Sequence, residues 1–178
     1  MCKNVEEVMV MNISSARIAC FSILALLFLT ALLPAPQHSQ SEELLPFETI
    51  ENFSRSGVKD RRTAVITKNR AWKNLWKEVH SIATPRPPKP EIDFDLQTVI
   101  AVFGGEQGDS TRSISITRVV RAGESVRVYT KETYNGPTCP PGPPIESEAY
   151  HIIVTDRIER AKVRVVFEET EEVERRCH

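Results

Sequence analysis

Hydrophobic and polar positions in the second half of the chain predict a series of short strands. The expected strands are Thr98–Phe103, Ser113–Val119, Val126–Thr130, Tyr150–Val154 and Val163–Phe167. Thr98–Phe103 is apolar at nearly every position, which is typical of a central strand covered on both faces. The next two segments alternate apolar and polar residues around a turn at Ala122-Gly123-Glu124, so they predict a hairpin.

Two strands and one helix are predicted earlier in the chain. Phe47–Phe53 alternates in a way that places its odd-numbered residues, including Thr49 and Glu51, on one face of a strand. The β-branched segment Thr63–Thr67 predicts a second strand. A 3.6-residue period then predicts a helix whose apolar stripe is Ala71, Trp72, Leu75, Trp76 and Val79.

Pro85 ends any continuation of this helix, and Pro85–Pro90 predicts a stiff, polyproline-like link. The expected order is therefore two strands, one helix and then about five strands. With 40% hydrophobic residues the chain can form a core. The predicted fold class is α+β, with a mostly antiparallel β-sheet and one packed amphipathic helix.

Residues 18–33 are uncharged for sixteen positions and directly follow Arg17. A cationic flank before a short apolar stretch is typical of a secretory signal. As a helix the stretch would span about 24 Å, against about 30 Å for the bilayer core, so a retained membrane anchor is the second interpretation. A buried core helix is the third and least favoured, because the stretch has no polar face. Pro34-Ala35-Pro36 offers no clean cleavage site, so cleavage stays open.

The chain is expected to divide into four segments. Residues 1–36 form the signal peptide or N-terminal membrane anchor, and residues 37–46 form a polar tether. Residues 47–168 form the α+β domain. Residues 169–178 form a charged tail, which is rich in glutamate.

Charge is spread unevenly over a chain whose formal net charge is −1. This balance argues against a general nucleic-acid binder. Between Arg55 and Lys89 there are ten basic and two acidic residues, whereas the C-terminal tail is acidic. One interpretation is a basic face for an acidic partner or anionic lipid. The favoured alternative is an ordinary solvated helix face, countered by the acidic tail.

Cys139 and Cys177 belong to the predicted domain, whereas Cys2 and Cys20 belong to the leader. Two cysteines in an oxidising compartment can pair, and closing that loop would contribute roughly 4 kcal/mol by chain entropy. The sequence does not show that they approach each other. A free or intermolecular Cys177 therefore stays an alternative.

A proline-rich segment, Asn135–Pro144, contains five prolines in ten residues. Proline fixes φ and removes a donor, so the segment is stiff and leaves carbonyl groups available. A rigid exposed loop loses little entropy on binding, which makes this segment the preferred contact site. A plain connection between strands is the alternative. The candidate contact residues are Pro137, Thr138, Pro140, Pro141, Pro143 and Pro144.

No catalytic residue, metal site or cofactor is predicted. Gly108-Asp109-Ser110 is similar to the G-D-S motif of one esterase class, but a serine nucleophile needs a base, and His151 lies in an apolar strand. The residues His80, His151, Cys139 and His178 lack the short spacing of zinc ligands. The glycine-rich loops that bind nucleotides are also missing from the sequence.

The order of several motifs resembles the C-terminal domain of the PrcB family, bacterial exported proteins named for an accessory subunit of a surface protease complex. The resemblance covers roughly residues 53–167. The motifs are W-x-x-L-W (Trp72–Trp76), I-D-F (Ile92–Phe94), V-I-A-V-F-G-G (Val99–Gly105), S-I-S-I (Ser113–Ile116), V-R-V (Val126–Val128), Y-H-I-I (Tyr150–Ile153) and V-V-F (Val165–Phe167).

This resemblance implies a non-catalytic partner domain in the cell envelope, without catalytic residues to carry over. The chain departs from the family at Gly108–Arg112, where the family has a further glycine and an aromatic residue. The first hypothesis is thus an exported interaction domain, membrane-anchored, periplasmic or secreted, that binds or stabilises another envelope or secreted protein such as a protease. A protease inhibitor that uses the proline-rich segment is the second hypothesis, and an esterase is the third.

Overall fold

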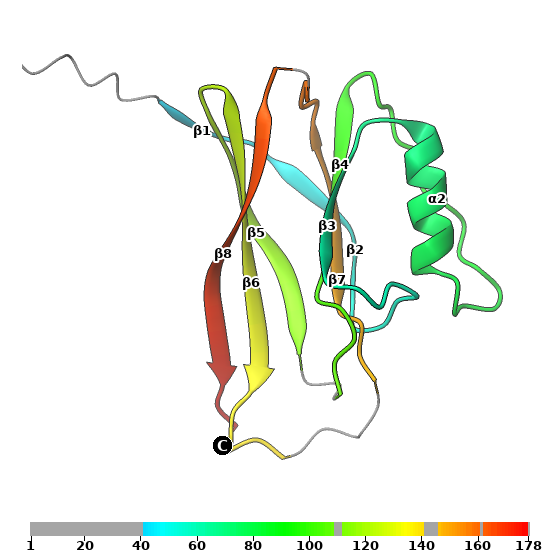
Figure 1. Cartoon of the computed structure of the whole chain (residues 1–178), viewed down its shortest axis with the longest axis vertical. Coiled ribbons are helices and arrows are strands. Elements are labelled where there is room, and N and C mark those ends of the chain that lie inside the picture. The colour runs from blue at the N-terminus through cyan, green and yellow to red at the C-terminus, as the bar shows by residue number, and fades with distance from the viewer. Residues whose placement is uncertain (1–40, 109–111, 141–145, 161, 178) are drawn as a thin grey trace, which may run out of the picture. The chain divides into compact units, whose positions relative to one another are not determined.

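The computed structural model describes residues 41–108, 112–140, 146–160 and 162–177. Its strands form two four-stranded sheets, and its helix, α2, spans Asn69–Val79. Sheet A has the order β1 (Glu42–Leu44), β5 (Ser113–Ala122), β6 (Ser125–Asn135) and β8 (Arg164–Arg175). Sheet B has the order β2 (Phe47–Phe53), β7 (Tyr150–Asp156), β4 (Gln97–Phe103) and β3 (Arg62–Ile66). Figure 1 shows sheet A, sheet B and α2 as three successive layers.

Neighbouring strands are antiparallel throughout both sheets, except for the parallel pair β6 and β8. After β6 the chain crosses to sheet B, forms β7, and returns to sheet A as β8, which explains the parallel pair. The prediction of a mostly antiparallel β structure with one helix is confirmed for the residues that the structure describes. The expectation of one sheet is wrong, because the strands divide between two.

One apolar core fills the space between the two sheets. Ile100 and Val102 of β4 and Ile153 of β7 enter it from sheet B, and Ile116 and Val128 enter it from sheet A. All five side chains are buried. This core joins the sheets into one sandwich.

A second apolar core lies on the other face of sheet B. The alternate β4 residues Val99, Ala101 and Phe103 point into it, and Trp72 and Trp76 of α2 belong to the same cluster. Because successive side chains of a strand point to opposite faces, β4 supplies both cores at once. Its apolar character at consecutive positions is thereby explained, and the prediction of a strand covered on both faces is confirmed.

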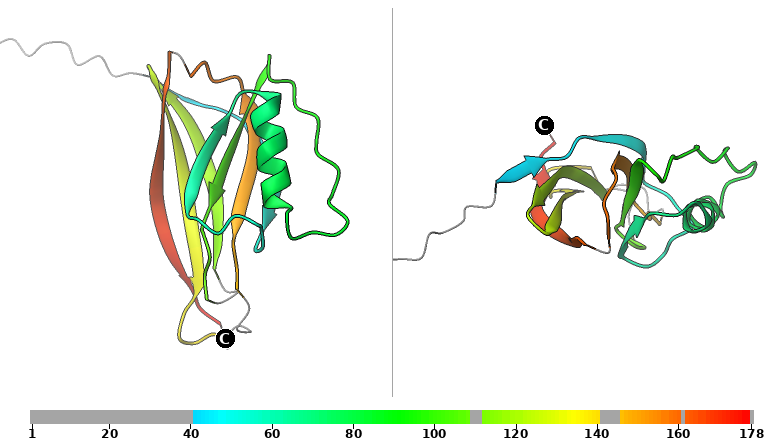
Figure 2. Two further views of the ribbon diagram at one scale, coloured as in Figure 1. Left: turned by 45° about the vertical axis from the view of Figure 1, so that its right-hand side comes forward. Right: turned by 90° about the horizontal axis from the view of Figure 1, so that it is seen from above.

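The stiff link after α2 is held against the helix by two tryptophans. The indole Nε1–H of Trp72 donates to the carbonyl oxygen of Pro90 at 3.0 Å, and that of Trp76 donates to Pro87 at 3.1 Å. A buried indole N–H needs an acceptor, and this segment of prolines has carbonyl groups free for the purpose. Figure 2 shows the segment after α2 running beside the helix.

The odd-numbered residues of β2 were expected to share one face, but a bulge between Thr49 and Glu51 interrupts the alternation. Thr49 lies toward sheet A, where its hydroxyl contacts His151, whereas Glu51 lies on the helix side and accepts a hydrogen bond from Tyr150. The extra residue of the bulge, Ile50, packs on the second core. A bulge shifts the alternation by one residue, so the prediction of one shared face is wrong.

The interpretation of residues 37–46 as a polar tether is wrong for its second half. Glu42–Leu44 forms β1 and pairs with β5, and Leu45 is 3% exposed. Glu42 and Glu43 form ion pairs with Arg127 and Arg121 of sheet A. The acidic residues that suggested a tether thus match basic residues far away in the sequence, and the domain begins before Phe47.

The interpretation of residues 169–178 as a charged tail is also wrong. Strand β8 continues to Arg175 and pairs with β6 along its whole length, so the domain does not end at residue 168. Charged residues suit an edge strand, because they discourage pairing with the edge of another molecule. Charge alone therefore did not distinguish a tail from a strand at the edge of a sheet.

The apolar segment 18–33 lies outside the described residues. Within the described part of the chain, no helix is long and apolar enough to cross a membrane.

Candidate interaction surface

Three of the candidate contact residues in the proline-rich segment are exposed. Pro137, Thr138 and Pro140 all lie at the surface, directly after β6. The other three candidate contact residues, Pro141, Pro143 and Pro144, lie outside the described residues. The N–H of Gly136, the second residue of the segment, donates to the carbonyl oxygen of Arg175 at 2.9 Å. The end of β8 thus holds the beginning of the segment.

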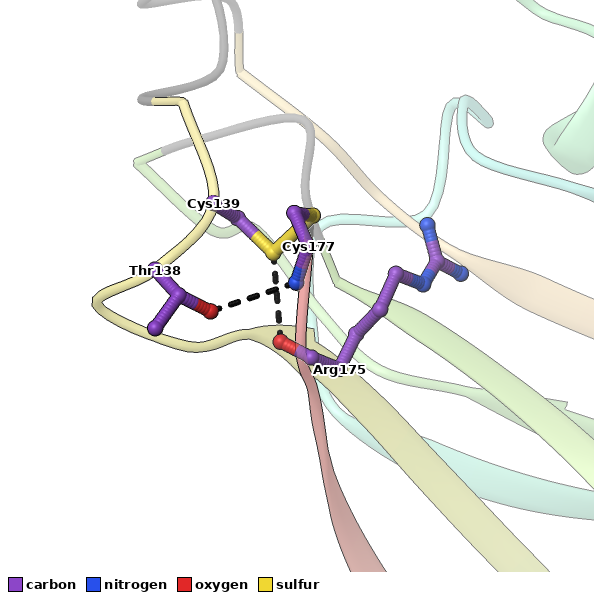
Figure 3. Close-up of a disulfide and its surroundings, with 4 residues drawn as sticks. All are labelled: Thr138, Cys139, Arg175 and Cys177. Atoms are coloured by element: carbon purple, nitrogen blue, oxygen red, sulfur yellow. Dashed lines mark hydrogen bonds between the residues drawn. A yellow bond between two sulfur atoms is a disulfide. The ribbon is translucent and has the colours of Figure 1, made fainter.

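A disulfide fixes this junction. Cys139 and Cys177 are bonded, with their Cα atoms 4.7 Å apart, so the pairing that the sequence left open is present in the structure (Figure 3). The backbone N–H of Cys177 donates to the Thr138 hydroxyl at 3.2 Å. Cys139 Sγ lies 3.2 Å from the carbonyl oxygen of Arg175, a van der Waals contact, because a disulfide sulfur has no proton to donate.

A groove of about 380 Å³ lies between α2 and the proline link. The side chain of Trp76 and Pro87 supply its apolar part. The rest of its lining is Lys73, Lys77, Arg86 and Lys89, together with Asn74. We call these residues the basic groove.

The cations of the basic groove are not neutralised by the acidic end of the chain. In the part of the chain that the structure describes, no ion pair involves Lys73, Lys77 or Arg86. The acidic residue of α2, Glu78, pairs instead with Arg62. Strand β8 belongs to sheet A, on the opposite side of sheet B from α2 (Figure 1). The acidic end of the chain therefore does not counter the basic face, whereas an ordinary solvated helix face stays the alternative to a contact surface.

His151 is a satisfied core residue that links the two sheets. Its Nδ1 accepts the backbone N–H of Ile116 at 2.7 Å, and its Nε2 lies 2.9 Å from the hydroxyl of Thr49. A backbone N–H can only donate, so Nδ1 carries no proton and Nε2–H donates to Thr49. Burial lowers the pKa of His151 to about 4. Both ring nitrogens are thus occupied, and the imidazole is neutral at physiological pH.

A cluster that the sequence did not suggest joins β2, β7 and the end of α2. Glu51 Oε2 accepts the Tyr150 hydroxyl at 2.8 Å and lies 3.0 Å from His80 Nε2. Burial, aided by the bond to Glu51, raises the pKa of Tyr150 well above its ordinary value. The glutamate and the tyrosine are 99 positions apart, so no local spacing could indicate the cluster. Glu51 thus accepts the hydrogen bond of the buried Tyr150 hydroxyl and lies beside the buried His80 ring.

Ser110, the serine of the G-D-S motif, lies outside the described residues.

In comparisons with known proteins, no family model, no curated protein and no solved structure matches this chain.

Lowering the pH from 6.5 to 4 is expected to remove a stabilising contribution of His151. The unfolded histidine, with a pKa near 6.5, binds a proton that the folded one, with a pKa of about 4, does not. The contribution is complete above pH 6.5, and up to about 3 kcal/mol is lost as the pH falls to 4. Urea denaturation at several pH values measures it. His151→Asn should be less stable at pH 7.5 and show a correspondingly smaller loss on acidification, and an identical pH dependence in both proteins would contradict this assignment.

Replacing both Cys139 and Cys177 by serine is expected to lower the free energy of unfolding by about 4 kcal/mol, the chain-entropy value for such a loop. The bond closes a loop across 38 positions that includes the crossing to β7 and back. Urea denaturation of the wild type with and without reductant provides the comparison, and the double variant serves as the reductant-insensitive control. Equal stability of the oxidised and reduced wild type would show that the bond contributes nothing.

Proposed function

We propose that this chain is a non-catalytic, exported accessory domain that binds an acidic surface of another envelope or secreted protein, such as a protease. The observation that carries the proposal is the basic groove, where Lys73, Lys77 and Arg86 have no ion-pair partner in the described part of the chain. An acidic partner would supply the missing carboxylates. Cations that face solvent in this way also accelerate encounter with a negatively charged protein.

The chemistry of the basic groove suits a peptide segment better than a small ion. Its lining combines the apolar surface of Trp76 and Pro87 with cationic side chains. A segment that combines carboxylates with an apolar side chain would contact both. In this proposal α2 works as a packed amphipathic helix, with Trp72 and Leu75 buried and Lys73 and Lys77 turned outward.

The proposed location is the cell envelope, with the domain anchored by residues 18–33 or released from them. The resemblance to the PrcB family supports this location, and the disulfide between Cys139 and Cys177 is compatible with it. The absence of a catalytic role is part of the same proposal. It is supported by His151, whose two ring nitrogens are already engaged within the core.

Inhibition of a protease is the second candidate, and one observation favours it. Pro137, Thr138 and Pro140 are exposed on a segment whose beginning is held by the disulfide. A loop that is fixed before binding loses little entropy when it enters an active-site cleft. The two candidates differ in their effect on the partner, because an inhibited protease gains activity when this protein is removed.

Charge reversal in the basic groove is expected to weaken partner binding. The full chain would be used to isolate its partner from the native envelope, and affinity would then be measured with the two purified proteins. Lys73→Glu combined with Arg86→Glu should raise the Kd at least about tenfold at low salt, and the difference should shrink as salt screens the charges. A protease partner would also be assayed with and without this protein.

The matched control is Arg164→Glu combined with Arg176→Glu. These residues are equally exposed and the change in charge is the same, but they lie on β8 and just beyond its end, away from α2. The control variant should bind like the wild type. Equal weakening of both variants, or of neither, would show that the basic groove is not the contact surface.

A further inference from the structure

Two connections between strands meet at one short bridge. Gln107 follows β4, and Ser147 precedes β7; the N–H of each donates to the carbonyl oxygen of the other, at 2.8 and 3.1 Å. Glu106, Glu146 and Glu148 are immediate neighbours of this pair. Because side chains alternate along extended chain, the residues that flank a bridged pair project to the same face. The bridge therefore brings three carboxylates together.

The three carboxylates lie close enough to share one ion. One oxygen from each of Glu106, Glu146 and Glu148 lies within 4.8 Å of the others. Lys59 lies beside them, with its Nζ 2.7 Å from Glu106 Oε2. The Lys59 side chain is 67% exposed, so its ammonium group can also be solvated when an ion binds the carboxylates.

Glu148 supplies an independent indication that a ligand belongs here. It is only 6% exposed, and its Oε2 is buried without a hydrogen-bond partner among the described residues. A buried carboxylate oxygen without a partner costs considerable free energy. A cation between Glu148 and the two exposed glutamates would remove that cost.

The backbone holds these glutamates in place. The N–H of Glu106 donates to the carbonyl oxygen of Lys59 at 2.8 Å, and that of Glu148 donates to Ser54 at 3.0 Å. Gly105, just before Glu106, has a φ of 76°, and a Cβ there would lie 2.8 Å from the backbone nitrogen of Arg61. The tight turn that directs Glu106 to the cluster thus requires glycine.

We propose that Glu106, Glu146 and Glu148 form a calcium-binding site. Calcium binds oxygen ligands at about 2.3–2.6 Å, so oxygens on opposite sides of one ion lie about 4.8 Å apart. The three carboxylate oxygens of this cluster lie within 4.8 Å of one another, so one calcium ion can contact all three. Carboxylates without histidine or cysteine favour a hard cation over zinc or copper. Magnesium demands a stricter octahedral geometry at about 2.0–2.1 Å and is usually held by one or two carboxylates, which favours calcium at a site of three.

The site goes beyond the proposed function and has a separate structural consequence. Glu146 follows Pro144, the last proline of the proline-rich segment, by two positions. The disulfide holds the beginning of that segment at Cys139. Calcium bound by Glu146 and Glu148 would hold the chain where the segment ends, so that both of its ends are fixed.

Calorimetric titration of the full chain with calcium chloride tests the proposal. One ion is expected to bind, with a Kd of about 10⁻⁴–10⁻³ M, the range of extracellular calcium modules. Glu148→Gln keeps the side-chain volume and should weaken binding at least about tenfold, as should Glu146→Gln at an exposed position. Lys59→Gln removes the competing cation and should tighten binding. Near-ultraviolet circular dichroism confirms that each variant is folded.

Glu124→Gln, in the exposed turn between β5 and β6, is the matched control and should bind calcium like the wild type. Magnesium chloride at the same ionic strength should bind more weakly. The proposal would be overturned by an absence of calcium binding up to about 10 mM, well above the expected range. Equal effects of Glu124→Gln and Glu148→Gln, or equal binding of both cations, would indicate diffuse charge screening and overturn it too. None of these results depends on a protein partner.

Discussion

Sheet B carries apolar side chains on both of its faces, and other parts of the domain must cover each face. The rest of the domain is arranged around that requirement. Strands β4 and β7 direct alternate residues toward sheet A and toward α2, and nearly all of them are buried. Neither face can be left to water, because each carries a continuous apolar surface. Sheet A covers one face, and α2 with its proline link covers the other. His151 and the two indole hydrogen bonds satisfy polar groups that this double burial removes from solvent.

This arrangement of layers determines where the proposed binding surfaces for a partner and for an ion lie. Because Trp72 and Trp76 turn inward, the opposite side of α2 presents its lysines to solvent beside Pro87. Because β7 lies in sheet B while β6 and β8 lie in sheet A, the chain must cross between the sheets at both ends of β7. The first crossing carries the proline-rich segment, with the disulfide at its beginning and the carboxylate cluster at its end. The proposed contact surfaces are thus consequences of the layer order.

Features encoded within a few residues could be predicted from the sequence. The alternation of Ser113–Val119, the helical period from Trp72 to Val79 and the apolar Thr98–Phe103 each specify a local structure. Features that depend on distant partners could not. From the sequence alone Glu42 is similar to a linker residue, because its partner Arg127 is 85 positions away. Likewise, the sequence does not show that the bridge between Gln107 and Ser147 brings Glu106 close to Glu148. The bulge in β2 also escaped prediction, because a shift of one residue leaves no mark in composition.

Because sheet B carries both apolar cores, we expect all three layers to unfold as a single cooperative unit. Native-state hydrogen exchange of the full chain, followed amide by amide, tests this most directly. Amides of β4 and β7 should exchange most slowly and only through global unfolding, together with those of β5 and β6. Exchange of sheet A at low denaturant, while β4 and α2 stay protected, would show that the layers unfold independently and would contradict it.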